Sequence, residues 1–199
     1  MTVQSAKPAV FLDRDGVLNE AIFRDGKPCP PRDLSELTIT SGARAALEEL
    51  KRKGFSLVVV TNQPDVRRSM ASRADVDNIN SHLAASLPLD AIEVCEHDDI
   101  DRCDCRKPKP GMILRARERL GLDLARSFMV GDRWRDIEAG RRVGCCTVLI
   151  GDGYGEPFPC APTIKLPSLP RAAAWIIQKA NTIGRLYEND PRPAGCHFR

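Results

Sequence analysis

The sequence predicts an α/β fold, a Rossmann-like parallel sheet sandwiched by helices. Short apolar runs alternate with helical patterns along most of the chain, as in strand–helix–strand units. Three of the apolar runs end in polar side chains that could bind an anion or a metal ion. Because ligands of open parallel sheets bind beyond the carboxyl ends of the strands, these side chains are predicted to form one site.

Five segments have the composition of buried strands, each being a run of four to six mostly apolar residues. They are residues 9–12, 55–60, 91–95, 127–130 and 146–150. Helices are predicted between and after them, at residues 42–53, 74–86, 110–120, 134–143 and 172–179. Pro110 is expected at the first helical position, where its missing N–H costs nothing. Residues 19–38 are expected to form an excursion that contains proline and aspartate.

Length and charge predict one domain. The chain has 199 residues and a formal net charge of +3, too small a charge to indicate nucleic-acid binding. No stretch approaches the length of a membrane span, and the polar start of the chain does not resemble a signal peptide. We therefore expect a cytoplasmic monomer with one domain over residues 1–187 and a flexible tail over 188–199. No insertion is long enough to form a large cap domain.

Two carboxylates follow the first predicted strand directly. Asp13 and Asp15 are separated by one residue and are followed by Gly16. Two acids at the end of a buried strand repel each other, and a divalent cation is the simplest way to keep both ionised. Oxygen ligands suit Mg²⁺, and a carboxylate can also act as a nucleophile toward phosphorus. The alternative is a polar loop that only follows a strand.

Three further segments offer polar groups. Thr61 and Asn62 follow the second strand and could bind phosphate oxygens, although threonine and asparagine before a proline also suit a turn. Asp132 ends the fourth strand and Asp136 lies one helical turn later, where acids are also common at a helix N-terminus. Lys107 supplies a cation. The order of these groups along the chain favours one common site over coincidence.

A cluster of soft metal ligands follows the third strand. Cys95, His97, Cys103 and Cys105 fall within eleven positions, and three thiolates with one imidazole form a common closed zinc site. The one-residue spacing within each pair departs from the usual C-x2-C knuckle. Residues 95–105 are predicted to hold a structural zinc ion that has no open position for catalysis. The rival is a disulfide from Cys95 to Cys103 or Cys105, which a cytosolic location disfavours.

Together these motifs resemble the haloacid dehalogenase superfamily, subfamily IIIA. The chain reads F-L-D-R-D-G-V-L-N from Phe11, T-N-Q from Thr61, C-R-K-P-K-P-G-M from Cys105 and V-G-D from Val130. With the C-x-H and C-x-C pairs of the predicted zinc loop, this combination is similar to the small histidinol-phosphate and heptose-bisphosphate phosphatase group. The resemblance covers roughly residues 8–151.

The resemblance implies a haloacid dehalogenase-like fold with a minimal cap, and a Mg²⁺-dependent phosphomonoesterase that forms an aspartyl-phosphate. Asp13 would be the nucleophile, and Asp15 the general acid that later serves as the base. Mg²⁺ would be bound by Asp13, by the backbone carbonyl of Asp15 and by Asp132. Thr61 and Lys107 would bind the oxygens of the transferring phosphoryl group.

Other side chains would shape the site around this centre. Asp136 would orient Lys107 or a metal-bound water, with plain helix capping as the alternative. Four residues are expected to bind the rest of the substrate, two of them as candidates for a second anion: Arg24, Asn62, Arg106 and Arg133. For Arg106 and Arg133 the alternative is a solvated surface position.

The expected substrate is a small phosphorylated metabolite. The motif set favours D-glycero-D-manno-heptose 1,7-bisphosphate, which would lose its 7-phosphate, with histidinol phosphate or another sugar phosphate as the alternative. Two loops that would read the substrate depart from the heptose pattern: residues 64–69 are P-D-V-R-R-S instead of S-G-x-x-R-G, and residues 20–26 lack G-Y-V. A non-catalytic phosphosugar-binding module is the alternative of another class, but a binder would not need Asp15.

Overall fold

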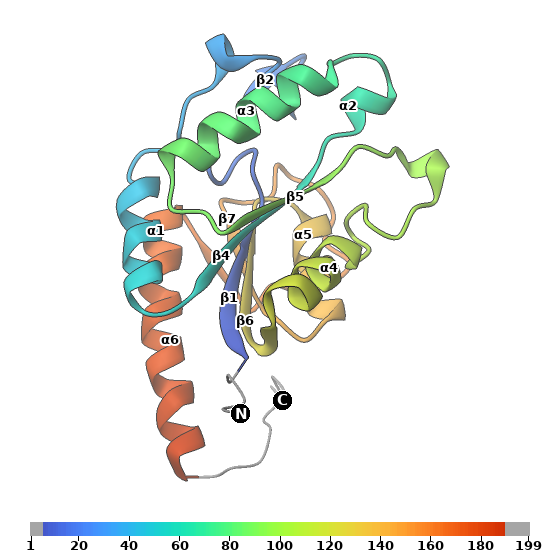
Figure 1. The fold of residues 1–199 in the computed structure, drawn as a ribbon. Coiled ribbons are helices and arrows are strands. Elements are labelled where there is room, and N and C mark those ends of the chain that lie inside the picture. The colour runs from blue at the N-terminus through green and yellow to red at the C-terminus, as the bar shows by residue number, and fades with distance from the viewer. Residues whose placement is uncertain (1–5, 190–199) are drawn as a thin grey trace.

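A six-stranded parallel sheet forms the centre of the molecule in a computed structural model that describes residues 6–189. The strand order is β5-β4-β1-β6-β7-β8, and all neighbours run parallel. The strands are β1 (Lys7–Leu12), β4 (Ser56–Asn62), β5 (Ala91–Cys95), β6 (Leu122–Gly131), β7 (Cys146–Ile150) and β8 (Ile164–Leu166). The predicted fold class is confirmed (Figure 1).

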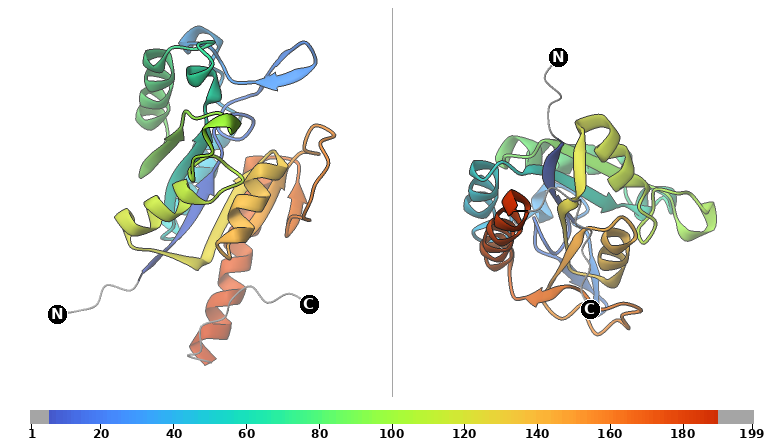
Figure 2. Two further views of the ribbon diagram at one scale, coloured as in Figure 1. Left: turned by 90° about the vertical axis from the view of Figure 1, so that its right-hand side faces the viewer. Right: turned by 90° about the horizontal axis from the view of Figure 1, so that it is seen from below.

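Helices cover both faces of this sheet. Among the described residues they are α1 (Ala43–Arg52), α2 (Pro64–Arg67), α3 (Arg73–Ser86), α4 (Gly111–Leu120), α5 (Trp134–Arg142) and α6 (Leu169–Asn189), with short 3-10 turns η1 (Leu34–Glu36) and η2 (Asp99–Asp101). Helices α1 and α6 lie on one side of the sheet and α4 and α5 on the other (Figures 1 and 2). The sheet is therefore the middle of three layers.

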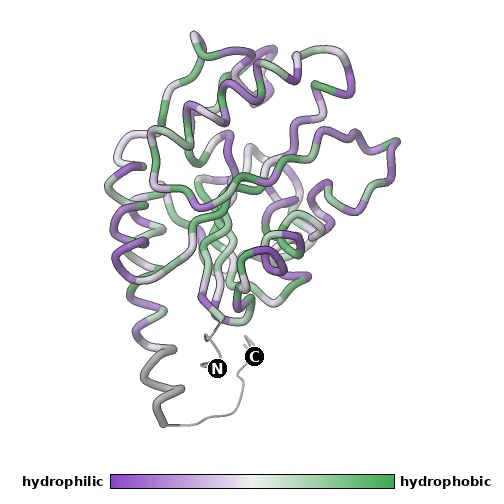
Figure 3. The backbone as a smooth tube through the Cα atoms, in the orientation of Figure 1, coloured by the Kyte–Doolittle hydropathy of each residue, from purple (hydrophilic) through white to green (hydrophobic). Residues whose placement is uncertain are grey.

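Successive side chains of a strand point to opposite faces of the sheet, which explains the two core layers. In β1, Val10 and Leu12 join the cluster that includes the inner faces of α1, α3 and α6, whereas Ala9 and Phe11 join the cluster that includes α4 and α5. All four side chains are fully buried, as expected for a strand covered on both faces. Apolar residues therefore run continuously along the central strands (Figure 3).

The chain changes direction across the sheet at β1. It passes from β1 to β4 and β5 on one side, then crosses to β6, β7 and β8 on the other. The register sets Leu12 opposite Val59 of β4 and Val130 of β6, and the N–H of Asp13 donates to the carbonyl of Val130 over 2.9 Å. The loops after these three strands therefore begin at one edge, at the switch point where ligands bind in such sheets.

The excursion over residues 19–38 contains a hairpin that the sequence analysis did not identify. Strands β2 (Ile22–Arg24) and β3 (Lys27–Cys29) pair antiparallel, and the turn between them has Asp25 and Gly26 at φ values of 50° and 71°. An Asp-Gly pair with positive φ at both positions is a strong hairpin signal. The small hairpin occupies the place where a cap domain could have been inserted, which agrees with a minimal cap.

Several element boundaries differ from the predicted ones. Pro110 is the N-cap of α4, so the helix begins one residue later than expected, within the usual uncertainty of helix ends. Strand β6 begins five residues before Ser127 because it also pairs with the start of β1. Strand β8 was not predicted, and α6 extends the predicted 172–179 helix in both directions. Of the predicted tail, residues 190–199 lie outside the described part of the chain.

Among residues 6–189, no helix combines the length and the apolar character needed to cross a membrane.

Candidate active site

The loop after β1 brings Asp13 against a buried lysine. The Nζ atom of Lys107 donates to Asp13 Oδ1 over 2.7 Å and forms an ion pair with Asp136 Oδ1 at 2.6 Å. Burial alone would lower the pKa of Lys107, but the charges of Asp13 and Asp136 outweigh it and raise this pKa above the ordinary value. Lys107 is therefore a permanent cation, 3% exposed, beside the predicted nucleophile.

Three carboxylates gather beside Lys107. Oxygen atoms of Asp13, Asp132 and Asp136 lie within 4.8 Å of one another. Burial raises the pKa of Asp13 to about 7 despite the attraction of Lys107, with Asp136 and Asp15 adding to the rise. Burial and the charge of Asp13 likewise raise the pKa of Asp132 well above its ordinary value. The site thus has more negative charge than one lysine neutralises, which favours a bound cation.

One oxygen of Asp132 provides a direct test of whether a metal ion fits. Asp132 is 3% exposed, and its Oδ1 atom is a buried oxygen without a hydrogen-bond partner among the described residues. Buried oxygens are rarely left unpaired unless an unseen water or ion satisfies them. A hard carboxylate oxygen is what Mg²⁺ prefers. The donor set of Asp13 and Asp132 therefore fits this ion.

Asp15 is held in place by three side chains that donate hydrogen bonds to its carboxylate. The buried guanidinium of Arg14 donates through Nε and Nη2 at 3.1 Å, and Asn19 Nδ2 donates to Oδ1 at 3.1 Å. Gln63 Nε2 donates to Oδ2 at 2.8 Å and also to the hydroxyl oxygen of Thr61 at 2.8 Å. Gln63 thus links the ends of β1 and β4 and leaves the Thr61 hydroxyl hydrogen free to donate.

Asn62, expected to bind substrate, forms two hydrogen bonds with the backbone of Lys107. Its Oδ1 accepts from the N–H of Lys107 at 3.0 Å, and its Nδ2 donates to the carbonyl of the same residue at 3.1 Å. Both polar atoms of the side chain are therefore used to clamp the Lys107 backbone to the end of β4. Asn62 lines the cavity, but its placement indicates that it positions Lys107.

A cavity of about 550 Å³ opens over these residues. Its lining includes Asp13, Asp15, Lys107 and Asp132, together with the acids Asp65 and Glu156. It also includes four arginines and a second lysine, here called the basic wall: Arg68, Arg106, Arg133, Arg135 and Lys27. Two of these, Arg106 and Arg133, are predicted anion-binding residues. These cations could bind a substrate that carries negative charge beyond the reacting phosphoryl group.

Arg24 does not line this cavity. Its guanidinium forms an ion pair with Glu36 and donates to the carbonyl of Pro30 at 3.0 Å. The hydrogen bond with Glu36 raises the pKa of Arg24. Arg24 therefore ties the hairpin to η1, whereas Lys27 of the same hairpin lines the cavity.

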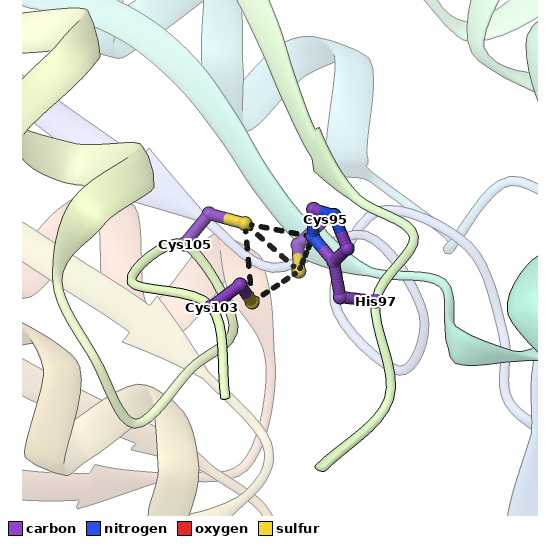
Figure 4. A group of neighbouring side chains, drawn as sticks. All are labelled: Cys95, His97, Cys103 and Cys105. Atoms are coloured by element: carbon purple, nitrogen blue, oxygen red, sulfur yellow. Dashed lines mark hydrogen bonds between the residues drawn. The ribbon is translucent and has the colours of Figure 1, made fainter. Parts of the chain in front are cut away.

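The four soft ligands converge on one point (Figure 4). The Sγ atoms of Cys95, Cys103 and Cys105 lie 3.2–3.8 Å apart, and His97 Nδ1 is 3.2 Å from Cys105 Sγ and 3.7 Å from Cys95 Sγ. A tetrahedral zinc ion with bonds of about 2.3 Å to sulfur requires edges of about 3.8 Å. None of these sulfurs is within S–S bonding distance of another, so the geometry fits a metal site and not the rival disulfides.

The loop between Cys95 and Cys105 also holds the basic wall of the cavity. Asp98 accepts two hydrogen bonds from Arg68 at 2.7 and 2.8 Å, and these lower the pKa of Asp98 to about 2. Asp99 accepts from Arg106 Nε at 2.7 Å and lies 3.6 Å from Arg135 Nη1. The cysteine–histidine cluster therefore anchors a loop whose acids orient three cavity arginines.

Some residues of the site were not identified from the sequence. Arg14, Gln63 and Tyr154 each contact a predicted catalytic or metal-binding acid. Arg14 and Gln63 stand inside the quoted motifs F-L-D-R-D-G and T-N-Q, so their position was a usable signal. Tyr154 lies 22 residues after its partner Asp132, and no local pattern marks it.

Asp136 forms both of the contacts that the sequence analysis considered. Its Oδ1 atom forms an ion pair with Lys107, and its Oδ2 atom accepts a hydrogen bond from the N–H of Arg133, which caps α5.

The acids and the buried lysine beyond the carboxyl ends of the parallel sheet suit phosphoryl transfer, and comparison with known proteins shows a hydrolase of the class that acts on phosphoric monoesters. A sequence profile of the haloacid dehalogenase-like hydrolases matches residues 31–144. The chain belongs to this family.

Known proteins of this family resemble the chain over most of its length. A D-glycero-beta-D-manno-heptose-1,7-bisphosphate 7-phosphatase from Escherichia coli strain K12 is 33% identical over 200 residues, which cover 94% of this chain and 97% of the relative. An enzyme of the same name from Vibrio cholerae is 36% identical over 179 residues, covering 82% of this chain and 93% of the relative.

A solved structure shows the same fold. The D,D-heptose 1,7-bisphosphate phosphatase from B. bronchiseptica, complexed with magnesium and phosphate, superposes with a TM-score of 0.75 at 29% identity, covering 86% of this chain and 99% of its own. A second heptose bisphosphate phosphatase, from Burkholderia thailandensis, has a TM-score of 0.59 at 25% identity and covers 86% of this chain and 99% of its own.

Proposed function

We propose that this protein is a Mg²⁺-dependent phosphomonoesterase that removes the 7-phosphate of D-glycero-D-manno-heptose 1,7-bisphosphate through an aspartyl-phosphate. The observation that carries the reaction is the triplet of Asp13, Lys107 and Asp136, in which one buried lysine contacts both acids at 2.6–2.7 Å. Such a lysine can neutralise phosphoryl oxygens beside the attacking carboxylate. The substrate is suggested by the relatives, which are named for it.

The residues suit a two-step transfer. Asp13 attacks phosphorus, the bond from phosphorus to the leaving oxygen breaks, and Asp15 donates a proton to that oxygen. Asp15 then accepts a proton from a water molecule that attacks the aspartyl-phosphate, so that inorganic phosphate leaves and Asp13 is restored. Lys107 and the Thr61 hydroxyl bind the oxygens of the phosphoryl group in both steps. The donors around Asp15 keep it aimed at the leaving group.

Two metal ions are part of the proposal. Mg²⁺ would be held by Asp13, Asp132 and the backbone carbonyl of Asp15, where it would neutralise the charge of the phosphoryl group. Zinc would be held by the closed set of Cys95, His97, Cys103 and Cys105, which leaves it no catalytic position. Burial raises the pKa of Cys95, so zinc binding would release a proton there.

The cavity supports a bisphosphate over a simple monophosphate. Arg106 and Arg133 lie on its wall, and both are candidates for the phosphate that is not removed. Arg106 is held by Asp99 and by the carbonyl of His97, whereas Arg133 is paired with Glu156. Histidinol phosphate, the alternative substrate, has a cationic amine in place of a second phosphate, so it would not use these two arginines. We further propose a cytoplasmic monomer with one domain over residues 1–187.

The decisive experiment is a phosphate-release assay. The protein is expected to release phosphate from a generic aryl phosphate only when Mg²⁺ is present, and to prefer heptose 1,7-bisphosphate within a panel that includes histidinol phosphate and simple sugar phosphates. No release from any compound in the presence of Mg²⁺ would leave the binding-module alternative standing. A preference for histidinol phosphate would change the substrate but not the reaction.

The charge of the metal site predicts how Mg²⁺ stabilises the fold at different pH values. Because the folded pKa of Asp13, about 7, exceeds its ordinary value of 3.8, the folded metal-free protein binds more protons than the unfolded chain between these values. The stabilising contribution of this carboxyl therefore decreases as the pH rises through that window. Mg²⁺ competes with the proton, so the rise in Tm that it causes should grow from about pH 5 to about pH 8. Thermal melts with and without Mg²⁺ at several pH values measure this rise in Tm. A rise that does not change with pH would contradict the prediction.

A further inference from the structure

Residues 151–156, here called the strap, hold one tyrosine at the edge of the metal site. Tyr154 has a φ of 57°, which side chains rarely adopt, and it stands between Gly153 and Gly155 at 77° and 68°. Its N–H donates to Asp152 Oδ1 at 3.0 Å. A non-glycine residue in this region marks a local strain that the surroundings must support, and such residues cluster at functional sites.

The strap places the Tyr154 hydroxyl against the carboxylate of Asp132. The hydroxyl donates to Asp132 Oδ2 over 2.6 Å. The ring is braced from two sides, by the edge of Phe23 at 5.8 Å between centroids and by the guanidinium of Arg133 at 5.9 Å from the ring centre. Phe23 belongs to the hairpin and Arg133 to the loop before α5, so two separate segments support the position of one hydroxyl.

The two oxygens of Asp132 have different surroundings. Oδ2 is bound by Tyr154 and packs so closely on Gly16 that a β-carbon there would lie 1.8 Å away. Oδ1 is buried and has no hydrogen-bond partner among the described residues. A carboxylate that is held through one oxygen has little rotational freedom, so its second oxygen keeps a set direction. Outer partners of metal ligands act in this way, and their loss typically lowers metal affinity about 10- to 100-fold.

We propose that Tyr154 is a positioning residue that holds Asp132 so that its free Oδ1 atom meets Mg²⁺. The proposal rests on the proposed Mg²⁺-dependent reaction and adds a residue to it. A competing role is contact with the substrate, because Tyr154 also lines the cavity. The two roles differ in one measurable respect: a positioning residue changes the affinity for Mg²⁺ when no substrate is present.

The test is Tyr154→Phe, which removes the hydroxyl and keeps the ring between Phe23 and Arg133. Calorimetric titration of Mg²⁺ into the metal-free site of the whole protein, with the zinc cluster intact, is expected to give an affinity about 10-fold weaker than wild type. The matched control is Tyr187→Phe, the same change at the chain's other tyrosine, on α6. This variant is expected to bind Mg²⁺ with the affinity of wild type. Melting curves without Mg²⁺ check that each variant folds.

Each outcome supports or overturns the proposal. Equal Mg²⁺ affinity in wild type and Tyr154→Phe overturns it, and a loss of substrate affinity alone then assigns Tyr154 to the substrate. If wild type itself binds no Mg²⁺ and releases no phosphate, the proposed function fails and the positioning role fails with it. Should Tyr154→Phe not fold, Phe23→Ala loosens the ring while keeping the hydroxyl. It is expected to weaken Mg²⁺ binding by a smaller factor, and unchanged binding would again overturn the proposal.

Discussion

Asp13→Asn is expected to lower phosphate release by at least about 10⁴-fold, because an amide oxygen is a poor nucleophile toward phosphorus and is a weaker ligand for Mg²⁺. The fold should persist. Asparagine has nearly the same shape and can still accept the hydrogen bond that Lys107 donates to Asp13 Oδ1. Initial rates with an aryl phosphate measure the loss, and a thermal melt measures the stability.

The matched control for this variant is Asp77→Asn, the same substitution at an exposed position of α3. It removes one negative charge from a residue that does not line the cavity, and it should leave the rate at the wild-type value. Wild-type turnover in Asp13→Asn would remove this residue as the nucleophile. The reaction would then require another attacking group, such as a water molecule.

Cys103→Ser is expected to remove the metal ion from the cysteine–histidine cluster and to destabilise the fold by more than about 3 kcal/mol. A serine hydroxyl is a poor zinc ligand. Without the ion, the three remaining ligands would still lie close together, and nothing would offset the repulsion between them. For a domain of this size such a loss corresponds to a decrease in Tm on the order of 10 °C. Metal analysis of the wild-type protein should find about one zinc ion per chain.

Cys29→Ser serves as the control, since Cys29 lies on β3 outside the cluster. It should keep the zinc content and the Tm of wild type. Unchanged zinc content in Cys103→Ser would reject the proposed site. Because Asp98 and Asp99 of the same loop hold Arg68 and Arg106, the loss of zinc should also weaken binding of a bisphosphate more than that of an aryl phosphate.

The positions of the catalytic side chains could be predicted because they depend on strand ends. A buried parallel strand is recognisable as a short apolar run, and its first polar residue falls at the carboxyl edge of the sheet. Asp13, Thr61 and Asp132 each stand at such a point. Lys107 does not follow a strand directly, and its place in the order of polar groups along the chain, together with the resemblance to a known family, connected it with the others.

The surroundings of these side chains were much harder to predict. Arg24 was expected to meet the substrate but pairs with Glu36, and Asn62 was expected to bind phosphate but clamps the backbone of Lys107. Each residue is the last one of its strand, Arg24 of β2 and Asn62 of β4. The direction in which a side chain at a strand end points depends on the following turn and on partners that are distant in the sequence, and neither produces a local pattern.

The sequence by itself determined the layered fold, the acids at the strand ends and the soft ligand set, because hydrophobic periodicity and short motif spacing are local properties. The tertiary structure decided which partner each charged group has. It placed Lys107 between Asp13 and Asp136, brought Tyr154 to Asp132, and set the zinc loop against the cavity arginines. Such contacts join residues up to 94 positions apart, and electrostatic energy depends on distance in space, which only the folded chain defines.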